Sequence, residues 1–158
     1  MDQHADLLAE LKKFALTAVS AEALMQHIAD RLHEKMVRYN WVGFYLIDPA
    51  DPKVLVLGPF SGTFTPHRRI PLDQGLCGAA ASTGKTVVVD DVTADLRYLA
   101  GPEHTKSEIV APVLVKGQVA GELDVNSYFP RTFGSADRLF VESCAALVAD
   151  YLQAHPAS

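Results

Sequence analysis

Two aromatic and two acidic residues lie in strand-like segments, where together they could bind a positively charged ligand. Trp41 and Tyr45 are four residues apart in an aromatic and β-branched run, so in a strand they face the same side. Glu108 begins a second apolar run and Asp124 interrupts a third. Acidic side chains are rarely buried without a partner, and carboxylates beside aromatic rings suit an ammonium group. The four residues predict a small-molecule site, although Trp41 and Tyr45 also fit a plain core role.

Thiol chemistry would depend on two cysteines, Cys77 and Cys144. Cys77 lies between two glycines near the expected start of a helix, where the helix dipole lowers the pKa of a thiol. It is therefore a candidate nucleophile, and it is equally compatible with a small residue on the floor of a pocket. Cys144 falls on the apolar stripe of the last expected helix, so we predict a small buried hydrophobe there.

Other kinds of site are not predicted. None of the six histidines pairs with another histidine or a cysteine at ligand spacing, so we expect no metal site and no cofactor. Gly84-Lys85-Thr86 is similar to the end of a phosphate-binding loop. The residue five places before Gly84 is Ala79 rather than glycine, however, and a strand is expected to follow instead of a helix. Gly84 is instead predicted to end a helix.

Composition limits the class of protein and its partners. A chain of 158 residues is the size of one domain, with enough residues to bury a core. Its formal net charge of -5 argues against a nucleic-acid partner. The start of the chain has no secretory signal pattern, and no apolar run approaches the roughly 20 residues of a membrane span. We therefore expect a cytoplasmic protein with no membrane partner.

These residues must be positioned by a mixture of helices and hairpins. The strongest hairpin signal is Lys116-Gly117 between two apolar runs. Hairpins dominate and regular strand–helix–strand alternation is absent, which favours an α+β fold with an antiparallel sheet. The expected elements are helices over 2–18, from Ser20 onward, over 71–83 and over 135–152; strands over 41–47, 54–57, 86–89, 108–115 and 118–125; a loop over 58–69; and a long connection over 90–106.

Five short segments, in order, resemble the free methionine-(R)-sulfoxide reductase branch of the GAF fold. The resemblance covers roughly residues 20–152 of a chain that we treat as a single GAF domain, 1–158. It implies a six-stranded antiparallel sheet with helices packed on one face, and a homodimer with the terminal helices at its interface. The segments are Tyr39-Asn40-Trp41-Val42-Gly43-Phe44-Tyr45-Leu46, Gly58-Pro59-Phe60-Ser61-Gly62, Gly75-Leu76-Cys77-Gly78-Ala79-Ala80, Ser107-Glu108-Ile109-Val110 and Gly121-Glu122-Leu123-Asp124-Val125-Asn126-Ser127.

The resemblance also implies a reaction that this sequence is poorly equipped to perform. In the family a thiolate attacks the sulfur of free methionine-(R)-sulfoxide, methionine leaves, and the resulting sulfenic acid is resolved by a second cysteine and reduced by thioredoxin. The position of the nucleophile is Gly101 here, and the region of the usual resolving cysteine is Thr65-Pro66-His67. Cys77 alone retains a family cysteine. Loss of the nucleophile removes covalent catalysis, so we expect no such turnover.

The ligand-binding positions of the family are better retained. The resemblance assigns Trp41, Tyr45, Glu108 and Asp124 to the wall and carboxylates that hold the substrate. A further family carboxylate is replaced by Asn126, which removes a charge and adds a hydrogen-bond donor. The ligand is then a methionine sulfoxide-like molecule or another amino acid, with an altered affinity.

Three functional hypotheses stay open from the sequence. The first is a non-catalytic small-molecule binder, acting as a sensor in signalling. The second is a divergent reductase that uses Cys77 as its nucleophile. The third is a structural homodimer joined through the terminal helices, with Leu7, Leu11, Phe14 and Phe140 as its interface anchors.

Overall fold

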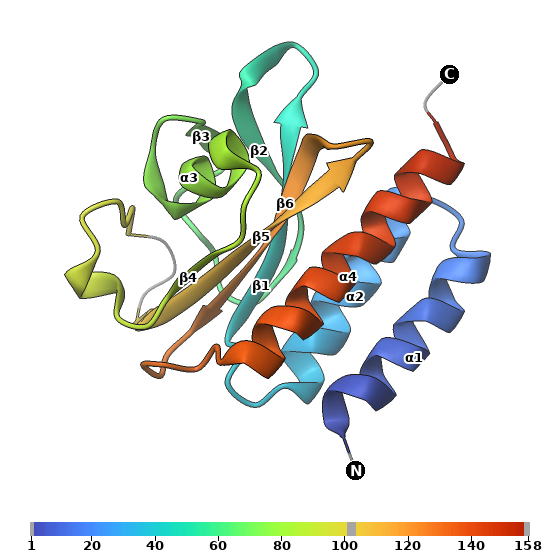
Figure 1. The fold of residues 1–158 in the computed structure, drawn as a ribbon, viewed down its shortest axis with the longest axis horizontal. Helices are drawn as coiled ribbons and strands as arrows, with labels where there is room; N and C mark the ends of the chain where they lie inside the picture. The colour runs from blue at the N-terminus through green and yellow to red at the C-terminus, as the bar shows by residue number, and fades with distance from the viewer. Residues whose placement is uncertain (1, 101–103, 157–158) are drawn as a thin grey trace.

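The computed structural model describes residues 2–100 and 104–156. Within these residues the helices and strands follow the order expected from the sequence, with a short strand β3 and a short helix η1 in addition (Figure 1). The elements are α1 (Gln3–Thr17), α2 (Ala21–Lys35), β1 (Trp41–Asp48), β2 (Asp51–Ser61), β3 (Arg69–Pro71), α3 (Gly75–Thr83), β4 (Val87–Val89), a short 3-10 helix η1 (Val92–Ala94), β5 (Ser107–Val115), β6 (Gln118–Ser127) and α4 (Ser135–Ala154).

The strands form one six-stranded sheet in the order β3-β2-β1-β6-β5-β4, and each neighbouring pair is antiparallel. This confirms the predicted α+β class and the antiparallel sheet. The expected loop over 58–69 was wrong at both ends, because β2 continues to Ser61 and β3 begins at Arg69. β3 has three residues, too few for a hydrophobic period to register, and it exists because Leu55 of β2 pairs with Ile70.

Side chains alternate between the two faces of the sheet and so divide the interior into two cores. On β1, Val42 and Phe44 belong to the core under the long helices, whereas Trp41 and Tyr45 belong to the core under α3. Figure 1 shows α1, α2 and α4 on one side of the sheet and α3 on the other. The expectation of helices on one face therefore holds for the three long helices only. The short helix α3 covers the opposite face, where the predicted binding residues lie.

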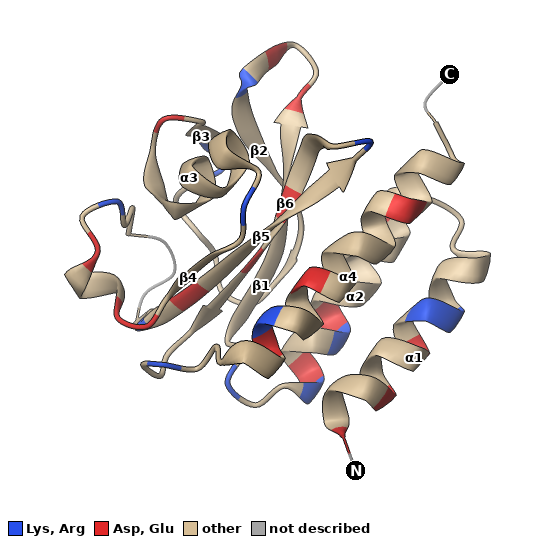
Figure 2. Ribbon diagram, in the orientation of Figure 1, with Lys and Arg blue, Asp and Glu red and all other residues tan. Residues whose placement is uncertain are grey.

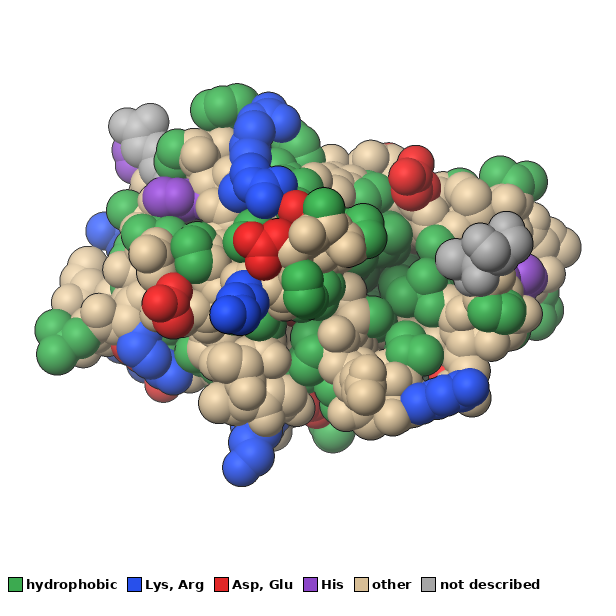
Figure 3. Space-filling model, turned by 90° about the horizontal axis from the view of Figure 1, so that it is seen from above, with side chains coloured by type: hydrophobic (Ala, Val, Ile, Leu, Met, Phe, Trp, Pro, Cys, Tyr) green, Lys and Arg blue, Asp and Glu red, His purple; other side chains and the backbone are tan. Residues whose placement is uncertain are grey.

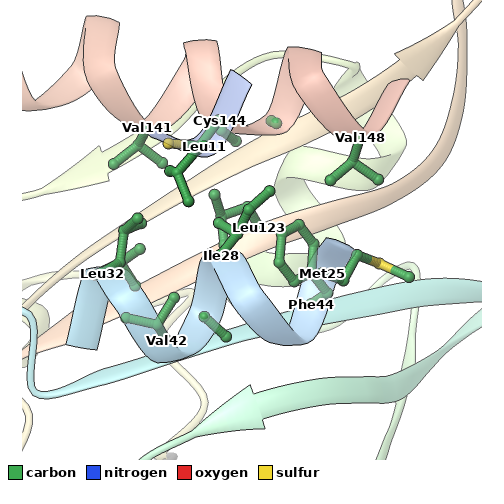
Figure 4. Packing of buried hydrophobic residues seen from close by; sticks show 14 of the residues in the cluster. Leu11, Met25, Ile28, Leu32, Val42, Phe44, Leu123, Val141, Cys144 and Val148 are labelled. Atoms are coloured by element: carbon green, nitrogen blue, oxygen red, sulfur yellow. The ribbon is translucent and has the colours of Figure 1, made fainter. Parts of the chain in front are cut away.

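The larger core is a continuous apolar layer between the sheet and the long helices (Figure 4). Ile28 of α2 and Cys144 of α4 are fully buried against strand residues such as Phe44 and Leu123. Burying an aliphatic or aromatic side chain of this size contributes roughly 1.5–3 kcal/mol to folding. Cys144 is thus the small buried hydrophobe that its position on the helix stripe predicted.

Helix α1 is the outermost layer and packs against α2 and α4. Leu7 and Leu11 point inward and are buried, and Phe140 of α4 is buried with them. Phe14 stacks on His27 of α2, with the two ring centroids 3.8 Å apart. Leu7, Leu11 and Phe140 are therefore not available as the dimer anchors predicted for them, because they are buried in the chain's own core, whereas Phe14 stays partly exposed.

The helix ends carry the signals read from the sequence. Ser20 caps α2, since its hydroxyl accepts a hydrogen bond of 3.0 Å from the Ala23 N–H. Gly84 ends α3 in the left-handed conformation, with φ of 68°, and its N–H donates to the Ala80 carbonyl. The Gly-Lys-Thr segment is thus a helix end, as predicted, and no phosphate loop.

Charged side chains lie over the outside of the molecule and, in a few places, inside the sheet. Figure 2 shows acidic positions in the middle of the sheet as well as on the helices. On the face seen in Figure 3, acidic and basic side chains are interspersed rather than gathered by sign. No helix within the described residues is long and apolar enough to cross a membrane.

Candidate functional site

The predicted binding residues meet in one cavity on the α3 side of the sheet. Antiparallel pairing sets Trp41 of β1 opposite Asn126 of β6, and Glu108 of β5 opposite the same asparagine. Asp124 lies two residues before Asn126 and faces the same side. The full lining is Trp41, Tyr45, Thr65, His67, Ile70, Gly75, Leu76, Cys77, Leu99, Glu108, Asp124 and Asn126.

Trp41 forms an aromatic wall that also fixes the loop after β2. Its ring stacks near Phe60, with centroids 5.7 Å apart, and lies over Gly43, where an added Cβ would fall within 2.3 Å of the indole. The indole N–H donates a 2.9 Å hydrogen bond to the Thr63 carbonyl. The buried N–H is thereby satisfied, as a buried tryptophan requires. The ring of Trp41 thus lines the cavity, while its indole N–H is bonded to the loop after β2.

Tyr45 and His67 form the roof of the cavity, on the side of the loops that follow β2 and precede β5. The Tyr45 hydroxyl donates a 2.7 Å hydrogen bond to the His67 carbonyl, and the His67 ring makes a short contact with the Ala100 carbonyl. These contacts tie the loop after β2 to the long connection before β5. The free space inside is about 20 Å³, roughly enough for one water molecule. A ligand of amino-acid size therefore requires this roof to open.

Glu108 and Asp124 are both buried at the base of the cavity, with 6% and 4% of their surface exposed. Burial raises the pKa of each carboxyl, and the proximity of the two groups raises that of Glu108 further. The Asn126 amide donates a 3.2 Å hydrogen bond to Asp124 Oδ1, and its own oxygen accepts one from Thr105. Neighbouring buried carboxyls cannot all ionise without a compensating cation. The site therefore favours a positively charged group.

Cys77 lies in the first turn of α3 with only 5% of its surface exposed. Its Sγ donates a hydrogen bond to Asp124 Oδ2 at 3.5 Å. Burial raises the pKa of this thiol well above its usual value, and the nearby carboxyls of Asp124, Glu122 and Glu108 raise it further. Burial and acidic neighbours thus outweigh the helix N-terminus that suggested a reactive thiolate. The position matches the floor-of-pocket interpretation.

A second thiol is not close to Cys77 in the described part of the chain. Both cysteines are free, and Cys144 is buried in the other core, between the sheet and the long helices. The position expected for the family nucleophile, Gly101, lies outside the described residues, but a glycine has no thiol in any conformation. Where the resolving cysteine is expected, Thr65 and His67 line the cavity instead.

Sequence reasoning missed one buried acidic residue that lies behind the cavity lining, Glu122. It lies on β6 opposite Tyr45 and two residues before Asp124, so it projects from the same face of the sheet. Its side chain is fully buried, and neither carboxylate oxygen has a hydrogen-bond partner among the described residues. The signal was present as Glu122, Asp124 and Asn126 at a period of two in an otherwise apolar strand.

The geometry and the comparisons agree on the class of protein. A family model described as the GAF domain matches residues 20–152, and the chain belongs to this family. Within it, the chain is homologous to free methionine-R-sulfoxide reductases. It is 35% identical to the enzyme of Saccharomyces cerevisiae over 82% of this chain and 70% of that protein. It is 34% identical to the enzyme of Escherichia coli over 78% of this chain and 73% of that one.

A solved structure shows the same relationship in three dimensions. The free methionine-R-sulfoxide reductase of Neisseria meningitidis, determined in complex with its substrate, superimposes with a TM-score of 0.90. The two sequences are 32% identical, and the match covers 98% of this chain and 92% of that one. This likeness spans both cores and the cavity, so the resemblance stated from short segments is confirmed.

Proposed function

We propose that this chain is a small-molecule-binding GAF protein that binds a free amino acid of the methionine sulfoxide type without reducing it. The observation that carries this proposal is a cavity with an aromatic wall, buried carboxyls and a single buried thiol that lies against them. Trp41 and Tyr45 would pack on the apolar side chain of the ligand. Glu108 and Asp124 would accept hydrogen bonds from its ammonium group. The positive charge of that group would also compensate the negative charge of the two buried carboxylates.

The chemistry of the thiol supports binding without turnover. A reductase needs a thiolate to attack the sulfoxide sulfur, and burial together with three nearby carboxyls favours the neutral thiol of Cys77. No second cysteine lies beside it in the described residues to resolve a sulfenic acid. The proposal includes a homodimer, which the family resemblance implies. It also includes a cytoplasmic location, expected from the two free cysteines and the absence of a signal pattern, and a sensing role, expected from a retained pocket without the catalytic cysteine.

The second candidate function is a divergent reductase with Cys77 as its nucleophile. One observation favours it, because the thiol lines the cavity from the first turn of α3. An ammonium ligand that neutralises Glu108 and Asp124 would relieve part of the charge that opposes the thiolate. Turnover would then require a thiol from outside the chain, such as dithiothreitol or a thioredoxin-like protein, to reduce the sulfenic acid on Cys77.

The deciding experiment supplies purified protein with free methionine-(R)-sulfoxide and dithiothreitol and quantifies methionine over time. We expect no methionine above the level of a protein-free control, together with a rise in melting temperature that saturates with the sulfoxide. Methionine formation that is abolished in Cys77→Ser would establish the reductase instead. Absence of both turnover and a melting shift, across amino acids and their sulfoxides, would leave the purely structural hypothesis and overturn our proposal.

A further inference from the structure

Several buried acidic groups lie close together at the base of the cavity, where no cation compensates them among the described residues. Cys77 Sγ and the carboxylate oxygens of Glu108 and Asp124 lie within 4.8 Å of one another, and all three residues are buried. In a tetrahedral zinc site, with metal–sulfur bonds of about 2.3 Å and metal–oxygen bonds of about 2.0–2.2 Å, ligand atoms are separated by about 3.5 Å. Side-chain adjustments of about 1 Å would bring the three atoms to that spacing.

Glu122 gives a second, independent indication that a positively charged ligand binds at this cluster. Its carboxyl is fully buried and lies near the Cys77 thiol and Asp124. The Cys77 thiol donates to Asp124 instead, and neither Glu122 oxygen accepts a hydrogen bond of acceptable geometry from the described residues. A buried carboxyl without a partner is costly and is rarely retained in a folded core. The amino-acid site does not use it, since Glu122 does not line the cavity.

We propose that Cys77, Glu108 and Asp124 form a binding site for one divalent metal ion of the zinc type, with Glu122 placed beside the sulfur ligand. A thiolate with two carboxylates is a donor set that suits Zn²⁺ and Co²⁺ better than Mg²⁺ or Ca²⁺, which prefer oxygen alone. A bound metal would displace the thiol proton and supply the positive charge that lets two neighbouring carboxylates stay buried. These ligands include no histidine, so the spacing of the histidines in the sequence gives no sign of the site.

The surroundings have the features expected around a metal site. The Asn126 amide holds Asp124 Oδ1, which leaves Oδ2 on the side of Cys77 Sγ. Such outer contacts orient a ligating carboxylate. In its protonated form, Glu122 can donate a hydrogen bond to the metal-bound thiolate. The space beside these groups, about 20 Å³ with Tyr45 and His67 in place, is large enough for a single ion or a water ligand.

The site would be tested with the metal alone, independently of any amino acid. The full chain, freed of tags and dialysed against a chelator with a thiol-free reductant, would be titrated with ZnCl₂ by calorimetry. It would also be titrated with CoCl₂ by absorption spectroscopy. We expect one ion per chain and a sulfur-to-cobalt charge-transfer band in the near ultraviolet. Sub-stoichiometric binding, or cobalt spectra without that band, would overturn the proposal.

Variants assign the ligands. Cys77→Ser should abolish the charge-transfer band, and Glu108→Gln and Asp124→Asn should each weaken zinc binding at least tenfold. Cys144→Ala, which removes the other buried thiol, and Asp95→Asn, which removes a carboxylate from a surface turn, should leave both readouts unchanged. Zinc binding that survives Cys77→Ser at full strength would show an adventitious surface site and would contradict the inference.

The wild-type spectrum keeps the test decisive even where a variant fails to fold. It also separates this inference from the proposed function. A chain that binds zinc and ignores amino acids would support the metal site and contradict the amino-acid proposal. A chain that binds an amino acid and not zinc would do the reverse.

Discussion

At the scale of single residues, the site is defined by how buried acids are compensated. Asp124 has a hydrogen bond on each oxygen, from Asn126 on one side and Cys77 on the other. Glu122 has none. A net hydrogen bond contributes about 0.5–1.5 kcal/mol, whereas a buried group left without a partner costs about 1–3 kcal/mol. Asn126 therefore stabilises the ligand-free site and Glu122 destabilises it.

Replacing Asn126 with aspartate should destabilise the ligand-free protein. Asn126→Asp removes the donor to Asp124 and sets a third acidic group against Asp124 and Glu108. We expect a loss of about 1–3 kcal/mol in the free energy of unfolding, measured by urea denaturation at neutral pH. In Asn40→Asp the acceptor oxygen that binds the Tyr128 N–H is kept, outside the cavity, so this variant should lose less. Equal losses in the two variants would contradict the role assigned to Asn126.

Removing the Glu122 carboxyl should stabilise the protein, increasingly so as the pH rises. Burial holds the pKa of Glu122 well above its ordinary value of about 4.5, so the folded state binds a proton that the unfolded state releases. Its contribution is complete below about pH 4.5 and is lost as the pH rises toward the folded pKa. In the presence of a chelator, the free energy of unfolding of Glu122→Met should therefore be higher than that of the wild type by about 1–3 kcal/mol at pH 7. The difference should be smaller at pH 4.5.

Urea denaturation at several pH values measures this difference. Glu22→Met, on the exposed first turn of α2, is the matched control and should show no such pH-dependent gain. A gap between Glu122→Met and wild type that is constant from pH 4.5 to 7 would show that Glu122 keeps an ordinary pKa.

At the scale of elements, the site depends on how closely α3 packs against the backbone of residues 71–72, the segment that links β3 to α3. Gly78 faces the backbone of Leu72 and Pro71, and an added Cβ would lie 2.8 Å from the Leu72 carbonyl oxygen. That oxygen belongs to the backbone and cannot rotate away. The absence of a side chain at residue 78 therefore sets the depth at which α3 places Cys77 under the sheet.

Gly78→Ala tests this constraint, because two effects oppose each other. Alanine favours a helix over glycine by about 1 kcal/mol, whereas overpacking against backbone costs about 1–3 kcal/mol. We expect overpacking to win, with a lower melting temperature and weaker ligand binding at the cavity. Ala79→Gly, the neighbouring position on the same helix, isolates the propensity effect and should lose about 1 kcal/mol with binding unchanged. A more stable Gly78→Ala would show that α3 can shift outward freely.

The same scale shows what the sequence could and could not predict. Helices α1, α2 and α4 and the β5–β6 hairpin were predictable, because their apolar periods extend over many residues and Ser20 and Gly117 mark their ends. β3 was not, since three residues become a strand only through pairing with β2. Trp41, Tyr45, Glu108 and Asp124 were found as a set. Glu122 was missed, although it precedes Asp124 by two residues in the same strand, because the sequence alone does not show that its carboxyl is buried without a hydrogen-bond partner.

At the scale of the whole molecule, the expected homodimer needs a different surface from the one first predicted. Leu7, Leu11 and Phe140 are consumed by the chain's own core. The terminal helices still carry apolar side chains on the outside, notably Leu139 of α4, which is 67% exposed. Leu139 lines a shallow hollow between α1 and α4 together with Ala5, Leu8 and Ala136. A second copy seated on this hollow would continue the helical core across a two-fold axis.

Leu139→Glu should therefore dissociate the dimer without unfolding the chain. A charge at the centre of a small apolar interface is desolvated there on association and stays solvated in the monomer, so the penalty falls on the dimer alone. Sedimentation velocity at several protein concentrations should give a dimer for the wild type and a monomer for Leu139→Glu, with equal helix content by circular dichroism.

Leu96→Glu is the control, because Leu96 is fully exposed in the connection on the other side of the sheet. A wild type that is monomeric at every concentration, or a dimer that survives Leu139→Glu, would remove the α1–α4 surface from consideration. The cavity under α3 lies across the sheet from this surface, so ligand binding should be the same in both states.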